Sequence, residues 1–209
     1  MLSVKKVPTD WVVTGGRDIN ILVIDSHIDT SSSIYKDKVI YLKELNFQCG
    51  YSTSHCDSVC KIISYVAPLC KIGVYQILRN KTSDIFGLKI ALRDVMNLDF
   101  DIINLSMATS KDDQELKNLI GELSKTKLIV SSVSNIKMQS YPADYPEVLS
   151  VASFANSDME ADLYCSDRLG ITDKTGNSMA TAFISGVCAL AKSYDKGITK
   201  DLIKSQLQK

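Results

Sequence analysis

The sequence predicts an α/β protein, a three-layer sandwich in which a mostly parallel central sheet is flanked by helices. The first observation is the run Asn20–Asp25 (NILVID), which is apolar and β-branched up to a closing acid, as in a strand buried on both faces of a parallel sheet. The second is the alternation of strand-like and helix-like segments behind it, the pattern of βαβ units. The third is that the 209 residues contain no internal repeat, low-complexity segment or linker, which predicts a single domain over 1–209.

Each further element has a local signal. A helix is expected to begin at Ser54, beside His55, because Ser54 and Asp57 form an S-x-x-D start pattern and apolar residues follow at helical spacing, at positions 59, 62, 63 and 66. The alternating patterns then predict strands at 71–78, 101–106, 127–133 and 147–152, and helices at 85–96 and 113–124. The very apolar segment 178–191 predicts a buried helix, and Thr199 caps a short helix at 199–208.

The charge balance excludes several classes of partner. The chain carries 24 basic and 24 acidic residues and has a pI near 6.7, which leaves no basic surface for nucleic acid or anionic lipid. No apolar run reaches the length of a membrane span, and the segment 1–10 lacks the apolar core of a signal peptide. We therefore expect a cytoplasmic protein without nucleic-acid or membrane partners, in which six cysteines remain thiols: Cys49, Cys56, Cys60, Cys70, Cys165 and Cys188.

Polar side chains gather where the predicted strands end. Asp25 closes the first strand, Ser106 closes a later one, and Asn135 follows a third. The carboxyl ends of parallel strands lie at one edge of a sheet, so these side chains are expected to converge there. Ser178 stands at the start of the long apolar helix, at the positive end of its dipole. Together with His55, these residues place an acid, a histidine, an amide and a hydroxyl as candidates for one face of the molecule.

This set of groups suits acyl transfer. A serine hydroxyl is a poor nucleophile until an imidazole takes its proton, and that imidazole needs a buried carboxylate to fix its tautomer. Asp25 suits the orienting role, and the helix start beside His55 favours the neutral imidazole that a general base must be. The Asn135 amide and the backbone N–H of Ser178 would then stabilise a developing oxyanion.

Four sequence blocks, in order along the chain, resemble those of the subtilisin-like serine proteases, the subtilases. They read ILVIDSHID; SHCDSVCKIISYVAPLCKIGVYQIL; DFDIINLSMA with LIVSSVSN; and TGNSMATAFISGVCALA. By this resemblance they carry the catalytic aspartate (Asp25), the histidine (His55), the oxyanion-hole asparagine (Asn135) and the nucleophile (Ser178), in the order Asp, His, Ser found in subtilisin. YPADYPEVLSVASF is also similar to the family, so the resemblance covers nearly all of 20–207 and implies a subtilisin-like fold.

The resemblance implies a serine endopeptidase that cleaves a peptide or protein substrate through an acyl-enzyme, with no cofactor and no metal. An extended peptide is expected along 105–108 and beside a second edge near 83–85, with a first specificity pocket walled by 131–134. The substrate-binding residues expected on this basis are Ser83, Asp84, Ile85, Leu105, Ser106, Met107, Ala108, Ser132, Val133 and Ser134. We expect a restricted peptide or precursor substrate, because no pro-segment is visible and side chains replace the family's usual loop glycines at His27, Cys56 and Ser134.

Departures from the family pattern leave a second function open. Asn177 stands where the family has threonine, and Ala182 where it has proline. The alternative is a catalytically weak, subtilase-fold module that binds peptides without turnover. A hydrolase of another acyl substrate is the third interpretation.

Some residues also have rival interpretations. His27 is the other candidate base, although a relay from Asp25 through it is awkward because only one residue separates the two. Cys56 and Cys60, one helical turn apart beside His55, suggest zinc, but the paired C-x-x-C spacing is missing and core thiols are favoured. The loop after the first strand contains no glycine to cradle a nucleotide phosphate. Cys56 itself is either a reactive, low-pKa thiol at a helix start or an inert core thiol.

Overall fold

A computed structural model of the chain describes residues 6–31, 37–45, 54–77 and 85–209. Within these ranges seven strands form one sheet in the order β2-β3-β1-β4-β5-β6-β7, and each strand is parallel to its neighbours. The strands are β1 (Asn20–Asp25), β2 (Val39–Glu44), β3 (Lys71–Gln76), β4 (Ile102–Leu105), β5 (Leu128–Ser132), β6 (Leu149–Ser153) and β7 (Leu163–Cys165). The helices are α1 (Thr9–Val12), α2 (Ser54–Val66), α3 (Ile85–Asp94), α4 (Gln114–Leu123), the 3-10 helix η2 (Phe154–Asn156), α5 (Asn177–Tyr194) and α6 (Lys200–Leu207).

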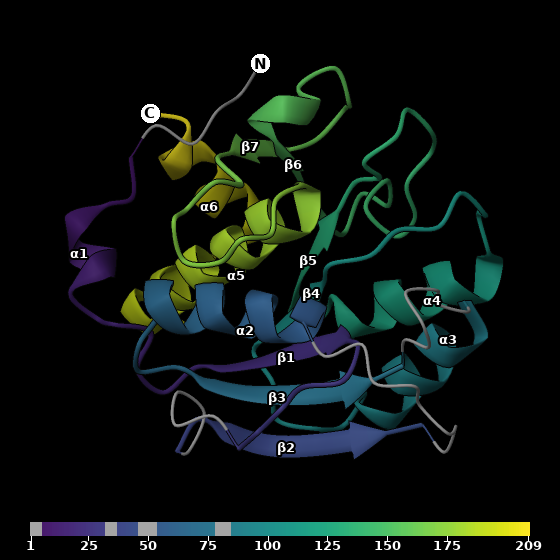
Figure 1. Ribbon diagram of the computed structural model, residues 1–209, viewed down its shortest axis with the longest axis horizontal. Coiled ribbons are helices and arrows are strands. Elements are labelled where there is room, and N and C mark those ends of the chain that lie inside the picture. Colours follow the sequence, from purple (N-terminus) through teal and green to yellow (C-terminus); the bar gives the residue numbers. More distant parts are fainter. Residues whose placement is uncertain (1–5, 32–36, 46–53, 78–84) are drawn as a thin grey trace.

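The sheet is the middle layer of three (Figure 1). Helices α2 and α5 cover one face, with α1 and α6 contributing to the same apolar core, and α3 and α4 cover the other face. This arrangement confirms the predicted three-layer α/β sandwich with a parallel central sheet. Crossing a lipid bilayer would need a longer, more apolar helix than any in the described ranges.

Strand β1 is buried on both faces, which explains its unbroken apolar sequence. Ile21 and Val23 belong to the core under α2 and α5, whereas Leu22 and Ile24 belong to the core under α3 and α4. Successive side chains of a strand point to opposite faces, so a central strand of a three-layer sandwich needs apolar residues at every position. The acid that closes this strand, Asp25, is therefore held at the sheet edge by a rigid, fully packed element.

The predicted elements are present, and their boundaries differ from the predicted ones by at most three residues; those of β1 coincide with the prediction. Thr199 caps α6 as predicted, since its hydroxyl accepts a hydrogen bond from the Leu202 N–H at 3.3 Å. The sequence analysis missed α1, β2, η2 and β7. Strand β2 lies at the sheet edge with no buried residue, and β7 has only three residues, so neither carries a long apolar or periodic pattern.

Helices α2 and α5 approach each other closely at Gly186. A Cβ atom at this position would lie 2.7 Å from the Cβ of Val66 on α2, nearer than side chains can pack. A larger residue here would push the two helices apart. Because α2 begins beside His55 and α5 beside Ser178, the small residue helps to fix the relative position of two predicted site residues.

Candidate active site

The four predicted catalytic side chains occupy the carboxyl edge of the sheet or the first turn of a helix beside it. Asp25 ends β1, and His55 lies in the first turn of α2. Ser178 lies in the first turn of α5, and Asn135 follows β5 in the loop beyond its end. The structure joins them in two hydrogen-bonded groups, Asp25 with His55, and Asn135 with the turn that carries Ser178.

Asp25 and His55 form a direct pair. The Nδ1 atom of His55 lies 2.9 Å from Oδ1 and 3.0 Å from Oδ2 of the Asp25 carboxylate, which is completely buried. A carboxylate only accepts, so Nδ1 carries the proton and Nε2 of the neutral ring is left as an acceptor. The first turn of α2 is itself tied to the end of β1, because the Cys56 N–H donates to the Ser26 hydroxyl at 3.2 Å. This arrangement gives His55 the tautomer that a general base needs.

The environment of His55 raises the pKa of its imidazole above the ordinary value of 6.5. Burial is the largest influence and favours the neutral ring, but the hydrogen bond and the negative charge of Asp25 together outweigh it. The positive charge of Lys174, in the loop before α5, acts in the same direction as burial. Asp25 is therefore the group that decides the direction of the shift.

We expect His55 to titrate with a midpoint above pH 6.5, and Asp25→Asn to lower that midpoint. The substitution removes the negative charge and replaces the carboxylate acceptor with a neutral amide, whereas burial and Lys174, which lower the pKa, remain. The measurement is an NMR titration of the histidine ring protons in the Ser178→Ala protein. The chain has only two histidines, and His27→Ala assigns the signals. A midpoint at or below 6.5, unchanged in Asp25→Asn, would contradict the pairing.

The backbone before Ser178 requires glycine. Gly176 has a φ of +107°, a conformation that side-chain-bearing residues rarely adopt, and a Cβ there would approach the Asn135 amide oxygen to 3.1 Å. The Gly176 N–H is held by the buried carboxylate of Asp167 at 2.6 Å. This turn places Ser178 where α5 begins, and the first N–H groups of a helix have no acceptor within the helix.

The Ser178 hydroxyl is not hydrogen-bonded to His55 in this structure. Its Oγ donates to the carbonyl oxygen of Ser106, just beyond β4, at 3.0 Å. The Ser106 hydroxyl in turn lies 3.2 Å from the Ser178 carbonyl and 3.0 Å from the Asn104 amide oxygen. These contacts anchor the start of α5 to the end of β4. In free enzymes the bond between nucleophile and base is often long or misaligned and tightens only with substrate.

The Asn135 side chain is oriented by its amide oxygen. Oδ1 accepts the backbone N–H of Asn177 at 3.0 Å and lies 3.4 Å from the Asn156 amide nitrogen. Because the oxygen is engaged by the turn before Ser178, the NH₂ group is the end that remains to donate. An exposed amide donor beside a serine at a helix start is the arrangement an oxyanion hole needs.

The expected substrate-binding residues fall into three groups. Ser83 and Asp84 lie outside the described residues, and Ile85 begins α3. The side chains at Leu105, Ser106, Ser132 and Val133 are buried, and those at Met107, Ala108 and Ser134 are partly exposed. Strand β4 ends at Leu105, so the edge expected along 105–108 is not a continuation of the strand.

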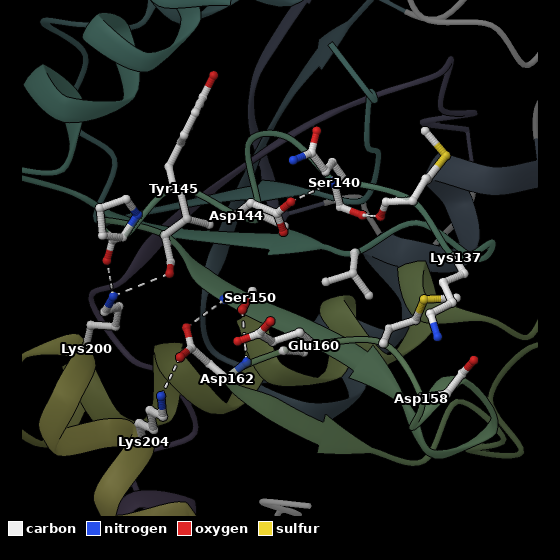
Figure 2. A pocket seen from close by; sticks show the side chains of 18 residues that line it. Lys137, Ser140, Asp144, Tyr145, Ser150, Asp158, Glu160, Asp162, Lys200 and Lys204 are labelled. Carbon is white, nitrogen blue, oxygen red and sulfur yellow. Dashed lines mark hydrogen bonds and ion pairs between the residues drawn. The ribbon is translucent and has the colours of Figure 1, made fainter. Parts of the chain in front are cut away.

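A cavity of about 870 Å³ lies behind the expected wall of the specificity pocket. Of the residues at 131–134 only Val133 lines it, and it contains none of the four predicted catalytic residues. Figure 2 shows two of its lysines engaged, Lys204 with Asp162 and Lys200 with backbone carbonyl oxygens, which are those of Pro146 and Val148. These bonds join α6 to the chain before β6 and to the chain before β7. The cavity therefore lies beside the candidate active site and is not lined by its predicted catalytic side chains.

His27, the rival base, lies in a different environment from His55. Its Nδ1 is 2.8 Å from the side-chain oxygen of Gln76, at the end of β3. The hydrogen bonds of Asp25 go to His55 and to the backbone N–H of Ser26. The geometry thus favours His55 as the partner of the buried carboxylate.

Cys56 is a buried core thiol, which favours the inert alternative over the reactive one. Its side chain is completely buried, with its sulfur 3.9 Å from that of Cys60. The hydrogen bond with Cys60 and burial raise the pKa of the Cys56 thiol well above its ordinary value. The helix start points Cys56 into the core because His55 occupies the face toward Asp25. Within the described parts of the chain, no three His, Cys, Asp or Glu side chains are grouped as metal ligands.

We expect maleimide to leave Cys56 unmodified in the native protein and to modify it after unfolding in urea. Only the thiolate reacts, and a buried thiol with a raised pKa forms little of it. Cys188, completely buried in α5 with its pKa raised by burial to about 12, is the matched control. Mapping the adducts by mass spectrometry assigns each one to its cysteine, so that modification of Cys56 or Cys188 is distinguished from modification of Cys49. Rapid native modification at Cys56 but not at Cys188 would contradict the burial.

The sequence analysis did not identify the residues that hold the site together. Asn177 was noted only as a departure from the family, and Asn156 and Asp167 not at all. The signal that could have pointed to Asn177 is its place next to the nucleophile, where an amide replaces a hydroxyl. Asn156 lies in η2, 21 positions from both Asn135 and Asn177, and only the fold brings it to the site.

Comparisons with known proteins bear on the family and the fold of the chain. The model of the subtilase family matches residues 48–168, more than half of the chain. The "Major intracellular serine protease" of Bacillus subtilis (strain 168) is 26% identical over 93% of this chain and 75% of its own length.

Solved structures share the fold at lower identity. A cold-adapted subtilisin-like serine proteinase has a TM-score of 0.76 at 18% identity, covering 91% of this chain and 81% of its own. The structure titled "Crystal Structure of a Lanthipeptide Protease" has a TM-score of 0.75 at 19% identity, covering 92% and 80%. The prenylagaramide maturation protease PagA has a TM-score of 0.72 at 21% identity, covering 89% and 79%. Because the family model matches residues 48–168, more than half of the chain, this chain belongs to the subtilase family of serine proteases.

Proposed function

We propose that this protein is a serine endopeptidase that hydrolyses peptide bonds through Asp25, His55 and Ser178, with Asn135 in its oxyanion hole. The observation that carries the proposal is the buried Asp25 carboxylate bonded to His55 Nδ1, which leaves Nε2 free to act as a base. Membership of a family of serine proteases supports the same chemistry.

Acylation begins when the Ser178 hydroxyl leaves the Ser106 carbonyl and turns toward His55. His55 Nε2 takes the hydroxyl proton as Oγ attacks the substrate carbonyl carbon, and Asp25 stabilises the imidazolium that forms. The carbonyl oxygen becomes an oxyanion that accepts hydrogen bonds from Asn135 Nδ2 and the Ser178 N–H. His55 then gives its proton to the leaving amine, and the C–N bond breaks.

Deacylation repeats these steps with water. His55 removes a proton from the water as its oxygen attacks the ester carbonyl of the acyl-enzyme, and the same donors hold the second oxyanion. Return of the proton to Ser178 Oγ breaks the ester bond and releases the carboxylic acid product. Each cycle consumes one peptide bond and one water and restores neutral His55.

We further propose a restricted peptide or precursor substrate. Two proteins of the same fold carry the titles of a maturation protease and a lanthipeptide protease. A peptide extended along the chain after β4 would contact Met107 and Ala108 on one side and Ser134 on the other. In this proposal the partly exposed side chains of His27 and Ser134 restrict the space for the substrate, and the buried Cys56 does not contribute to that restriction.

A fluorophosphonate probe tests the proposal without knowledge of the substrate. The activated serine attacks phosphorus and displaces fluoride, so the native protein should be labelled at Ser178, and Ser178→Ala should not be. Absence of labelling in the native protein would favour the peptide-binding alternative, for which the Ser178–Ser106 hydrogen bond is the supporting observation. A mass-spectrometric cleavage profile then defines the peptide used in kinetic work. Rapid digestion of many unrelated unfolded proteins would count against a restricted substrate.

A further inference from the structure

The side chain of Asn177 is completely buried between the nucleophile turn and the loop that carries Asn135. Its Nδ2 donates to two successive carbonyl oxygens, 3.1 Å from Val133 and 2.7 Å from Ser134. Its Oδ1 accepts the backbone N–H of Ser153, at the end of β6, at 2.8 Å. Both ends of this one amide are therefore used, and the residue before Ser178 is bonded to the residue before Asn135.

Backbone and side-chain contacts close the connection to Asn135. The Asn177 N–H donates to Asn135 Oδ1 at 3.0 Å, which leaves the Asn135 NH₂ group facing outward. Asn156 supports both residues, with its amide nitrogen 2.9 Å from Asn177 Oδ1 and 3.4 Å from Asn135 Oδ1. Three asparagines from three separate segments thus form one network, and Asn177 is its buried centre.

This network bears on the distance between the two proposed oxyanion donors. An oxyanion hole works only if its donors are already placed where the negative charge develops, and a displacement of about 1 Å can cost about 10²-fold in rate. One of the two proposed donors, the Ser178 N–H, lies in the turn after Asn177, and the other, Asn135 Nδ2, lies in the loop that Asn177 binds. The same side chain therefore holds both donors relative to each other.

We propose that Asn177 is a positioning residue, which acts through Asn135 by fixing its amide against the nucleophile turn. The inference rests on the proposed function, since it assigns a role within that oxyanion hole. Asn177 does not touch the substrate in this proposal. Its effect should therefore appear in kcat, where the oxyanion is stabilised, and not in KM.

The primary test is Asn177→Asp, which keeps the shape and the acceptor for the Ser153 N–H. It replaces the donating NH₂ with an oxygen facing the carbonyls of Val133 and Ser134. We expect kcat on the profiled peptide to fall by about 10- to 100-fold with KM within about twofold of the wild type. A kcat equal to that of the wild type would overturn the inference.

Asn156→Ala is a milder variant that decides the question if Asn177→Asp does not fold. It removes one contact to Asn177 and one to Asn135 from the half-buried side chain of η2. We expect a several-fold loss of kcat at unchanged KM. An unchanged kcat in Asn156→Ala, with Asn177→Asp unfolded, would overturn the inference.

A matched control separates positioning from general destabilisation. Val187→Ala removes buried methyl groups from the middle of α5, away from the first turn that carries Asn177 and Ser178. We expect it to lower the melting temperature and to leave kcat unchanged. Equal losses of kcat in Val187→Ala and Asn177→Asp would overturn the positioning role.

A double variant tests whether Asn177 acts through Asn135. If it does, Asn135→Ala combined with Asn177→Asp should have nearly the kcat of Asn135→Ala alone, because the group being positioned is already gone. Independent, multiplying losses would overturn the inference and leave the proposed function standing. A wild-type protein without turnover or fluorophosphonate labelling would overturn both.

Discussion

Ser178→Ala is expected to reduce turnover of the profiled peptide by about 10⁶-fold while leaving the fold intact. In our proposal Ser178 Oγ is the nucleophile and becomes the ester oxygen of the acyl-enzyme, and alanine has no nucleophilic atom in its place. Its hydroxyl contributes one hydrogen bond, to the Ser106 carbonyl, so the loss of stability should be small. The measurements are kcat by peptide cleavage and the melting temperature of the same preparation. Cleavage at the wild-type rate would show that another residue is the nucleophile.

His55→Ala and Asp25→Asn test the remaining members of the triad. We expect a loss similar to that of Ser178→Ala for His55→Ala, and of about 10⁴-fold for Asp25→Asn, whose amide can stabilise the wrong tautomer. Combining either with Ser178→Ala should add little, because the three groups act as a unit. His27→Ala is the matched control, a second histidine at the same edge of the sheet. An inactive His27→Ala beside a fully active His55→Ala would overturn the assignment of the base.

Asn135→Ala is expected to lower kcat by about 10²- to 10³-fold with little change in KM. The side chain is exposed in a loop, and its donor end acts only on the charge that develops as the carbonyl becomes tetrahedral. Asn118→Ala is the control, because Asn118 is an exposed asparagine on α4 that also accepts one side-chain hydrogen bond. Equal kcat in Asn135→Ala and the wild type would leave Asn135 as a turn residue only.

Much of the fold followed from local patterns because parallel sheets impose them. A strand buried on both faces must be apolar throughout, which is why Asn20–Asp25 could be recognised from its composition. Edge strand β2 was not predicted because burial does not constrain its residues. None of them is buried, and Ile40 is about half exposed. The same reasoning explains the boundary errors, since the last residues of an element are held by caps and neighbours and not by periodicity.

The sequence by itself determined the residue types of the candidate site and their order along the chain. Asp25, His55, Asn135 and Ser178 each stand at the end of a strand or the start of a helix, and sheet topology requires such positions to share an edge. The residue types and their positions follow from short-range sequence patterns and from a family resemblance. Neither of these depends on the side-chain conformations.

Only the tertiary structure decided how those side chains are used. It turned Cys56 into the core and His55 toward Asp25, although both stand at the same helix start. It also placed Asn177 and Asn156 around Asn135, through hydrogen bonds between residues that lie 21 to 44 positions apart. Such contacts are determined by the packing of α5 against the sheet, and the energy of each depends on partners that no local pattern of sequence specifies.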